Sequence, residues 1–314
     1  MQEWLAQHFG GDASLEGMQD WGLDDWYPVE KTPRAIVNTP AHFLYATIVS
    51  RTAAMMGKSQ AARHYRDVAA KVADNFNDQL LNRHSGQYGA NRSQAGQVMP
   101  LAVGLVPEAL RPAGERALLQ EIRENQNHLS TGFVSTPYLL QTIMDLAPEL
   151  GWEMTTAQDY PSYYSMTAGS DHDLMMEKWD GGMVCMPSLG GNIAGWHYQA
   201  LGGIRPDPAA PGFKKIIIKP NVVGDLHWVE SSYDSVHGRI TSNWRKRGDQ
   251  LSMDVIIPAS TTATVYVTCE AVSAITEGRK TIDKSEGVTF LRMEEGRAVF
   301  EVAAGSYAFR SEMN

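Results

Sequence analysis

One short segment, residues 160–182, combines the side chains from which carbohydrate sites are built. It sets acidic residues among tyrosine, tryptophan and glycine, and these acidic residues are Asp171, Asp173, Glu177 and Asp180. An aromatic ring can cover the apolar face of a sugar, carboxylates can bind its hydroxyl groups, and one carboxylate can transfer protons at a scissile bond. Glu177 is the first candidate for this proton transfer, although a glutamate beside Lys178 could also be an ordinary surface charge.

Tryptophans flanked by acidic residues extend this pattern. Trp179 precedes Asp180, and Trp26 follows Asp24 and Asp25. Tryptophan is mostly buried for packing alone, so it is the flanking carboxylates that favour a sugar-binding role for both indoles. Because Asp24 and Asp25 are adjacent in the chain, we expect only one of them to point into a cleft.

The histidines near these segments leave alternatives open. His128 could bind a substrate hydroxyl or cap the turn that follows it. His172 lies between Asp171 and Asp173, but one histidine with two carboxylates is a weak set of metal ligands, and a solvated acidic loop is the simpler interpretation. We therefore predict no metal and no cofactor, and we take Asp171 and His172 as candidates for substrate binding.

Composition limits the class of protein. The 314 residues are 43% hydrophobic and 20% charged, which is typical of a globular protein large enough for two domains. The net charge of -9 argues against a nucleic-acid groove, which needs a basic face. No apolar run approaches the roughly 18 to 20 residues of a membrane span, so we expect a soluble protein without a membrane partner. Cys185 and Cys269 are too few for a disulfide framework, and a cytoplasmic or a periplasmic location remains open.

The periodicity of the apolar residues changes once along the chain. Before residue 205 they recur every three or four positions, which predicts helices over residues 39–56, 59–81, 94–106, 107–125, 136–147 and 190–201. After a proline-rich linker, residues 205–212, short alternating runs predict strands over residues 214–219, 238–244, 251–257, 262–268 and 297–302. We predict a helical domain over residues 1–204 and an antiparallel β-sandwich over residues 205–314.

Several ordered motifs resemble α-L-rhamnosidases of glycoside hydrolase family 78. The motifs are Tyr160-Pro-Ser162 followed by Gly169, Glu177, Trp179, Asp180 and Gly181; residues 128–133 with 136–140; residues 97–107; Gly22-Leu-Asp-Asp-Trp26; and, in the β-rich part, residues 211–220, 223–226, 232–235 and 238–240. The resemblance implies an (α/α)6 barrel followed by a β-domain, and hydrolysis of a terminal α-L-rhamnoside with inversion. In such a scheme a base activates water while an acid protonates the leaving oxygen, with their carboxyl groups roughly 6.5 to 9.5 Å apart.

The resemblance gives Glu177 the role of the base but leaves the acid without a counterpart. The acid of the family lies well upstream of its Gly-Asp-Trp segment, and this chain begins shortly before the equivalent residues. Asp25, Asp171 or Asp173 could orient substrate or assist as the acid. The loop before Glu177 and the segment 188–192 also depart from the family pattern, so a different glycoside, such as a glucuronide or galactoside, is an alternative substrate.

The helical part is short for the implied barrel. At a typical helix length of about 11 residues it holds only about half of the helices required. The chain could therefore be a fragment, could pair with a second copy to complete the helical domain, or could have a reorganised site. We favour a partial barrel that forms a homodimer; a catalytically silent carbohydrate-binding or structural remnant is the alternative of another class.

Overall fold

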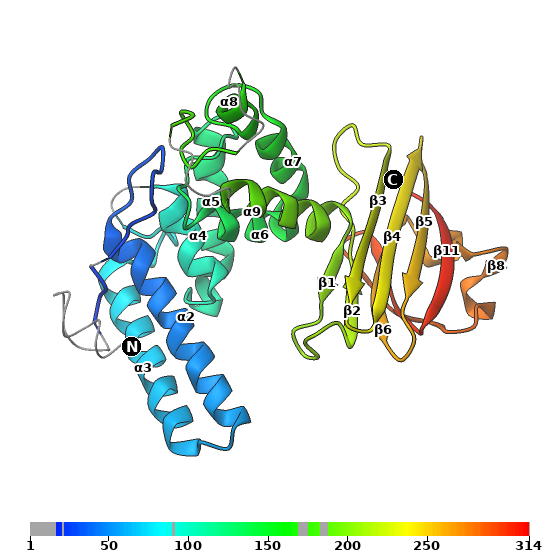
Figure 1. Ribbon diagram of the computed structural model, residues 1–314, viewed down its shortest axis with the longest axis horizontal. Coiled ribbons are helices and arrows are strands. Elements are labelled where there is room, and N and C mark those ends of the chain that lie inside the picture. The colour runs from blue at the N-terminus through cyan, green and yellow to red at the C-terminus, as the bar shows by residue number, and fades with distance from the viewer. Residues whose placement is uncertain (1–16, 21, 90–91, 169–174, 183–187, 314) are drawn as a thin grey trace. The chain divides into compact units, whose positions relative to one another are not determined.

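The computed structural model describes residues 17–20, 22–89, 92–168, 175–182 and 188–313. Its contacts divide the chain into two compact units, Met1–Ile193 and Ala194–Asn314. The described part of the first unit is helical, and the second consists mainly of strands (Figure 1). The chain is therefore an α domain followed by a β domain. No helix in the described ranges is long and apolar enough to cross a membrane.

The helical unit is organised around a long antiparallel hairpin, α2 and α3, with shorter helices beside it (Figure 1). Helix α4 contacts α2, α5 and α6, and α6 contacts α7. The elements are α2 (Arg34–Met55), α3 (Ser59–Leu80), α4 (Gln94–Ala102), η1 (Glu108–Leu110), α5 (Arg111–Glu124), α6 (Thr136–Leu146), α7 (Pro148–Thr156) and α8 (Tyr163–Thr167), and α9 (Ser188–Trp196) crosses into the second unit.

The hairpin is held together by one apolar face of α3. Val68, Ala69 and Val72 recur at helical spacing and pack with Ala46 of α2 in a single buried cluster. Further along α3, the Phe76 ring lies 5.3 Å from the ring of Tyr88, measured between centroids. The prediction of an amphipathic helix here is confirmed, because side chains three and four positions apart share one side of a helix.

Two of the differences between predicted and observed helices involve prolines. Helix α2 begins at Arg34, five residues before the predicted start, and contains Pro40. The helix predicted over residues 136–147 does end just before Pro148, at Leu146, but a further helix that was not predicted, α7, begins at Pro148 and contains Gly151. Proline lacks an N–H, and the first helical turn does not use that donor, so proline starts a helix at little cost.

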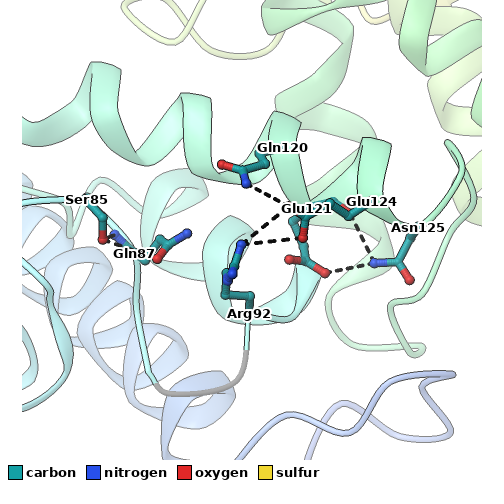
Figure 2. Close-up of polar contacts among 7 residues, drawn as sticks. All are labelled: Ser85, Gln87, Arg92, Gln120, Glu121, Glu124 and Asn125. Carbon is teal, nitrogen blue, oxygen red and sulfur yellow. Dashed lines mark hydrogen bonds and ion pairs between the residues drawn. The ribbon is translucent and has the colours of Figure 1, made fainter.

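A polar cluster at the end of α5 buries one carboxyl group (Figure 2). Glu121 is only 5% exposed, and Asn125 donates a hydrogen bond of 2.8 Å to its Oε1. Burial, together with the nearby charges of Glu30 and Glu124, raises the pKa of Glu121 to about 7. Arg92 pairs with Glu124 rather than with Glu121. Below neutral pH the buried carboxyl group of Glu121 is therefore mostly protonated and uncharged.

The second unit contains two β-sheets. One has the strand order β1-β2-β6-β10-β9 and the other β3-β4-β5-β11-β7-β8, and every described pairing is antiparallel except β2 with β6. The strands are β1 (Ile204–Pro206), β2 (Lys215–Ile218), β3 (Trp228–Ser235), β4 (Gly238–Arg247), β5 (Gln250–Ile257), β6 (Thr262–Thr268), β7 (Thr276–Glu277), β8 (Lys280–Thr281), β9 (Val288–Glu294), β10 (Arg297–Val302) and β11 (Gly305–Glu312). The helical turns η2 (His197–Leu201), η3 (Val272–Ala274) and η4 (Ile282–Lys284) lie before and between them.

The two sheets share one apolar core. Alternate residues of β4 and β5, such as Trp244 and Met253, pack with Val265 and Phe300 of the other sheet. Trp244 also donates its indole N–H to the carbonyl of Leu201 at 2.9 Å. The five predicted strands are confirmed, whereas the predicted linker is partly strand, because β1 pairs with β2.

Candidate active site

Three loops of the helical unit meet around the acidic residues that the sequence singled out. They are the segment before α2, the segment between α5 and α6, and residues 175–182. The first two are joined through the backbone, because Phe133 N–H donates to the carbonyl of Trp26 at 3.0 Å. The third is joined to both by tryptophan side chains, as described below. Residues far apart in the sequence thus form one polar and aromatic cluster.

Asp25 anchors the first loop to the second. Its side chain is fully buried, and its two oxygens accept backbone N–H groups of Gly132 at 2.7 Å and Ser135 at 2.8 Å. Burial raises the pKa of Asp25 to about 6, against the lowering effect of these hydrogen bonds. Because both oxygens are occupied and neither faces solvent, the geometry favours a role in positioning the loops over the predicted role at the substrate.

Glycine is required where these two loops touch. A Cβ atom at position 132 would lie 1.8 Å from the carbonyl oxygen of Asp25, which is far inside the contact distance of real atoms. The clash is with backbone, so no side-chain movement can relieve it. Gly132 therefore allows the close approach through which Asp25 reaches the second loop.

Glu177 is bound to the first loop through an indole. Its side chain is 8% exposed, and its Oε1 accepts the indole N–H of Trp26 at 2.8 Å. Its Oε2 is buried and has no hydrogen-bond partner among the described residues. Trp26 holds a left-handed backbone, φ 47°, which is strained for a residue with a side chain. This arrangement fixes one carboxylate oxygen and leaves the other available to accept a proton.

Trp179 joins residues 175–182 to the second loop. It is 2% exposed, donates its indole N–H to the carbonyl of Thr131 at 2.7 Å, and meets the ring of Tyr163 edge to face at 5.4 Å between centroids. The adjacent Lys178 places its ammonium 4.2 Å from the ring centre of Tyr27. Burial of the indole favours packing rather than a sugar platform for Trp179, so Trp26 is the better placed of the two predicted tryptophans.

The remaining predicted residues, Asp24, His128 and Asp180, make hydrogen bonds that do not involve Glu177. Asp24 accepts the backbone N–H of Trp26 at 3.0 Å and so shapes the same turn as Asp25. His128 contacts Asp159 at 2.9 Å through Nε2 and the carbonyl of Gln126 through Nδ1. Asp180 is exposed and accepts the N–H of Gly182 at 3.0 Å. None of these bonds joins His128 or Asp180 to Glu177.

Three further candidates, Asp171, His172 and Asp173, lie outside the described residues. Within the described part of the chain, no group of three or more histidine, cysteine or acidic side chains could hold a metal ion.

Thr131, Gly132 and Tyr163 support the site and were not predicted individually. Each lies inside a segment that the sequence analysis had singled out, around His128 or after Tyr160. Thr131 and Gly132 contact the site through a backbone carbonyl and a backbone N–H, which have no residue-specific signal in a sequence, whereas Tyr163 contacts Trp179 through its ring. The segment could therefore be found from the sequence, but the contacts could not.

Comparison with known families identifies the chain. The model of the bacterial α-L-rhamnosidase six-hairpin glycosidase domain matches residues 1–201, which include all three loops. The chain belongs to this family. The model of the bacterial α-L-rhamnosidase C-terminal domain matches residues 203–281, within the β unit. The resemblance stated from the sequence motifs is thereby confirmed.

Individual rhamnosidases match nearly the whole chain but are much longer. An α-L-rhamnosidase of Streptomyces avermitilis is 29% identical over 92% of this chain and 28% of its own length. The crystal structure of the Streptomyces avermitilis α-L-rhamnosidase complexed with L-rhamnose superposes with a TM-score of 0.85 at 25% identity, covering 99% of this chain and 30% of that one. The structure of an α-L-rhamnosidase from Dictyoglumus thermophilum gives 0.81 at 26% identity, covering 93% and 34%. The chain thus spans about a third of the length of its rhamnosidase relatives.

Proposed function

We propose that this chain is a glycoside hydrolase of the rhamnosidase type, in which Glu177 is the general base of an inverting hydrolysis of terminal α-L-rhamnosides. The observation that carries the proposal is the state of this carboxylate: it is buried, its Oε1 is bound by the Trp26 indole, and its Oε2 lacks a partner in the described chain. A base must be held at a fixed place and keep one oxygen for the proton that it removes. Membership of the family supports the substrate class.

The proposed step is the deprotonation of water by the free oxygen of Glu177. The water attacks the anomeric carbon from one side of the sugar ring while the bond to the leaving oxygen breaks on the other side, which inverts the configuration. The indole N–H stabilises the carboxylate and prevents it from rotating away. The ring of Trp26, half-buried at the same place, supplies an apolar surface for the sugar.

Asp25 acts through position rather than through contact with the substrate. By binding Gly132 and Ser135 it holds the loop that carries Trp26. The displacement of a catalytic group by about 1 Å can cost about 100-fold in rate, so a rigid support is part of the mechanism. Among the described residues, no carboxylate has a geometry that assigns it the role of the acid.

A panel of nitrophenyl glycosides tests the proposal. A nitrophenolate leaves with little help from an acid, so turnover of the α-L-rhamnoside by the 314-residue chain is expected even if the acid contributes weakly. Faster turnover of a glucuronide or galactoside would show that the chain is a glycoside hydrolase with a substrate other than a rhamnoside. Calorimetric binding of rhamnose with no turnover of any aryl glycoside would replace the proposal with a catalytically silent carbohydrate-binding protein.

The helical unit is further proposed to associate with a second copy. Helix α2 exposes large apolar side chains on one face, namely Tyr45, Ile48, Val49 and Met55, and Met56 is exposed just beyond its end. An apolar face of this kind is costly in water and is normally covered by protein. Light scattering is expected to give the mass of a dimer, and the single variant Ile48→Glu, which puts a charge in the centre of this face, is expected to give a monomer. A wild-type chain that is monomeric and well folded would contradict the proposal.

A further inference from the structure

The six-stranded sheet carries a row of polar and aromatic side chains on the face that points away from its core. Successive side chains of a strand alternate between the faces, so residues next to the buried Trp244 and Met253 lie on the outer face. The strand register aligns one such residue from each of five neighbouring strands: Trp228, Arg245, Ser252, Arg310 and Thr276. Four of these strands, β3, β4, β5 and β11, can be followed side by side in Figure 1.

Two hollows open along this row. The larger, about 440 Å³, is lined by Arg245, Arg247 and Arg310 together with Ser252, Thr276 and Glu312. The other, about 340 Å³, is lined by the same two arginines of β4 with His227, Trp228 and Lys246. Both volumes fall in the range of about 300 to 1,000 Å³ that is usual for small-molecule sites. Arg245 and Arg247 of β4 thus line both hollows.

The larger hollow has a charge opposite to that of the chain. The chain has a net charge of -9, yet the larger hollow contains three guanidinium groups and one carboxylate, Glu312. Arg310 is paired with Asp254 at 3.0 Å, whereas Arg245 and Arg247 form no ion pair within the described chain. A guanidinium presents parallel N–H groups that match a planar carboxylate. The hollow therefore suits an anion with a carboxylate group.

Trp228 supplies an exposed aromatic ring beside the arginines, which is the other feature of a sugar-binding site. Its side chain is 56% exposed at the edge of the sheet, opposite Arg245 in the register. An indole that is exposed to this extent contributes little to the hydrophobic core. A flat aromatic ring beside hydrogen-bonding groups is the usual surface on which a pyranose ring stacks. The hydroxyl groups of Ser252 and Thr276 line the adjoining hollow and can bind sugar hydroxyls.

We propose that this outer face is a second carbohydrate-binding site, specific for glycans that carry uronic acid residues. The carboxylate of one uronate lies in the hollow between Arg245, Arg247 and Arg310, and the neighbouring sugar ring stacks on Trp228. The site goes beyond the hydrolytic function and makes no use of Glu177. It would hold an acidic, rhamnose-containing polysaccharide at the enzyme while a terminal sugar is removed elsewhere.

Calorimetric titration with trigalacturonate and with its methyl ester tests the proposal on the 314-residue chain. The ester keeps the sugar rings and removes the charge, so it should bind at least about tenfold more weakly, as expected for loss of charge-assisted hydrogen bonds. The double variant Arg245→Gln/Arg247→Gln and the single variant Trp228→Ala should each lose about tenfold in affinity for the acid form. Arg239→Gln, on the same strand but outside the hollows and paired with Asp234, is the matched control and should bind like the wild type.

Several results would overturn this assignment. They are equal binding of the acid and the ester, an equal loss of affinity in the control variant, absence of binding by the wild type, or preferential binding of oligodeoxythymidylate, which would indicate a nucleic-acid surface. If the double variant does not fold, the affinities of the wild type for trigalacturonate and for its methyl ester still test the proposal. Binding by Glu177→Gln should equal that of the wild type, so failure here is separable from failure of the hydrolase proposal.

Discussion

Replacing Glu177 with glutamine is expected to lower kcat on an aryl α-L-rhamnoside by about 100-fold to 10,000-fold, the usual contribution of a general base. Glutamine keeps the size of the side chain and an oxygen that can accept the Trp26 N–H, but it cannot take a proton from water. The loss should appear mainly in kcat rather than in KM, because in the proposed mechanism Glu177 acts on water and not on the bound sugar. Steady-state kinetics with a nitrophenyl rhamnoside measure both.

Azide distinguishes a lost base from a distorted site. Azide attacks the anomeric carbon without needing to lose a proton, so it should restore part of the turnover of Glu177→Gln and yield an inverted glycosyl azide. Glu108→Gln, an exposed carboxylate in the helical unit, makes the same chemical change away from the site and should leave kcat unaltered. Wild-type kcat in the Glu177 variant would exclude this residue as the base.

Replacing Asp25 with alanine is expected to lower the free energy of unfolding of the helical unit by about 2 to 5 kcal/mol. The variant leaves the buried N–H groups of Gly132 and Ser135 without acceptors, and each orphaned donor costs about 1 to 3 kcal/mol. Loss of this anchor should also release the turn that carries Trp26 and so reduce kcat. Denaturant unfolding followed by circular dichroism at the helix band measures the stability.

Two comparisons make the Asp25 prediction specific. Asp67→Ala, an exposed aspartate on α3, should change stability by no more than about 0.5 kcal/mol. In the wild type, the pKa of Asp25 is raised to about 6, so between about pH 4 and pH 6 the folded chain holds a proton that the unfolded chain has lost. The stability advantage of the wild type over the alanine variant should therefore shrink, by up to about 3 kcal/mol, as pH rises through this window and stay constant above it. An advantage that grows with pH would contradict the raised pKa.

Much of the fold could be read from periodicity. The α3 helix was predicted because its apolar residues recur at helical spacing, and β5 and β6 were predicted because theirs alternate. Strands such as β3 and β9 were missed because they expose most of their side chains and have no alternation to detect. Helix α7 was missed because a proline at its first position looks like a terminator when only the local sequence is known.

The candidate site, like the fold, has some features that the sequence determined and others that only the structure showed. The sequence alone determined the family, the order of an α and a β domain, and Glu177 as the acidic residue of interest, because these depend on residue types at fixed local spacing. Only the tertiary structure decided that Trp26 holds Glu177, that Asp25 is an internal anchor, and that Trp179 is buried under the loops. Those contacts join residues more than a hundred positions apart in the chain, or use backbone groups that every residue has, and neither leaves a mark in a single sequence.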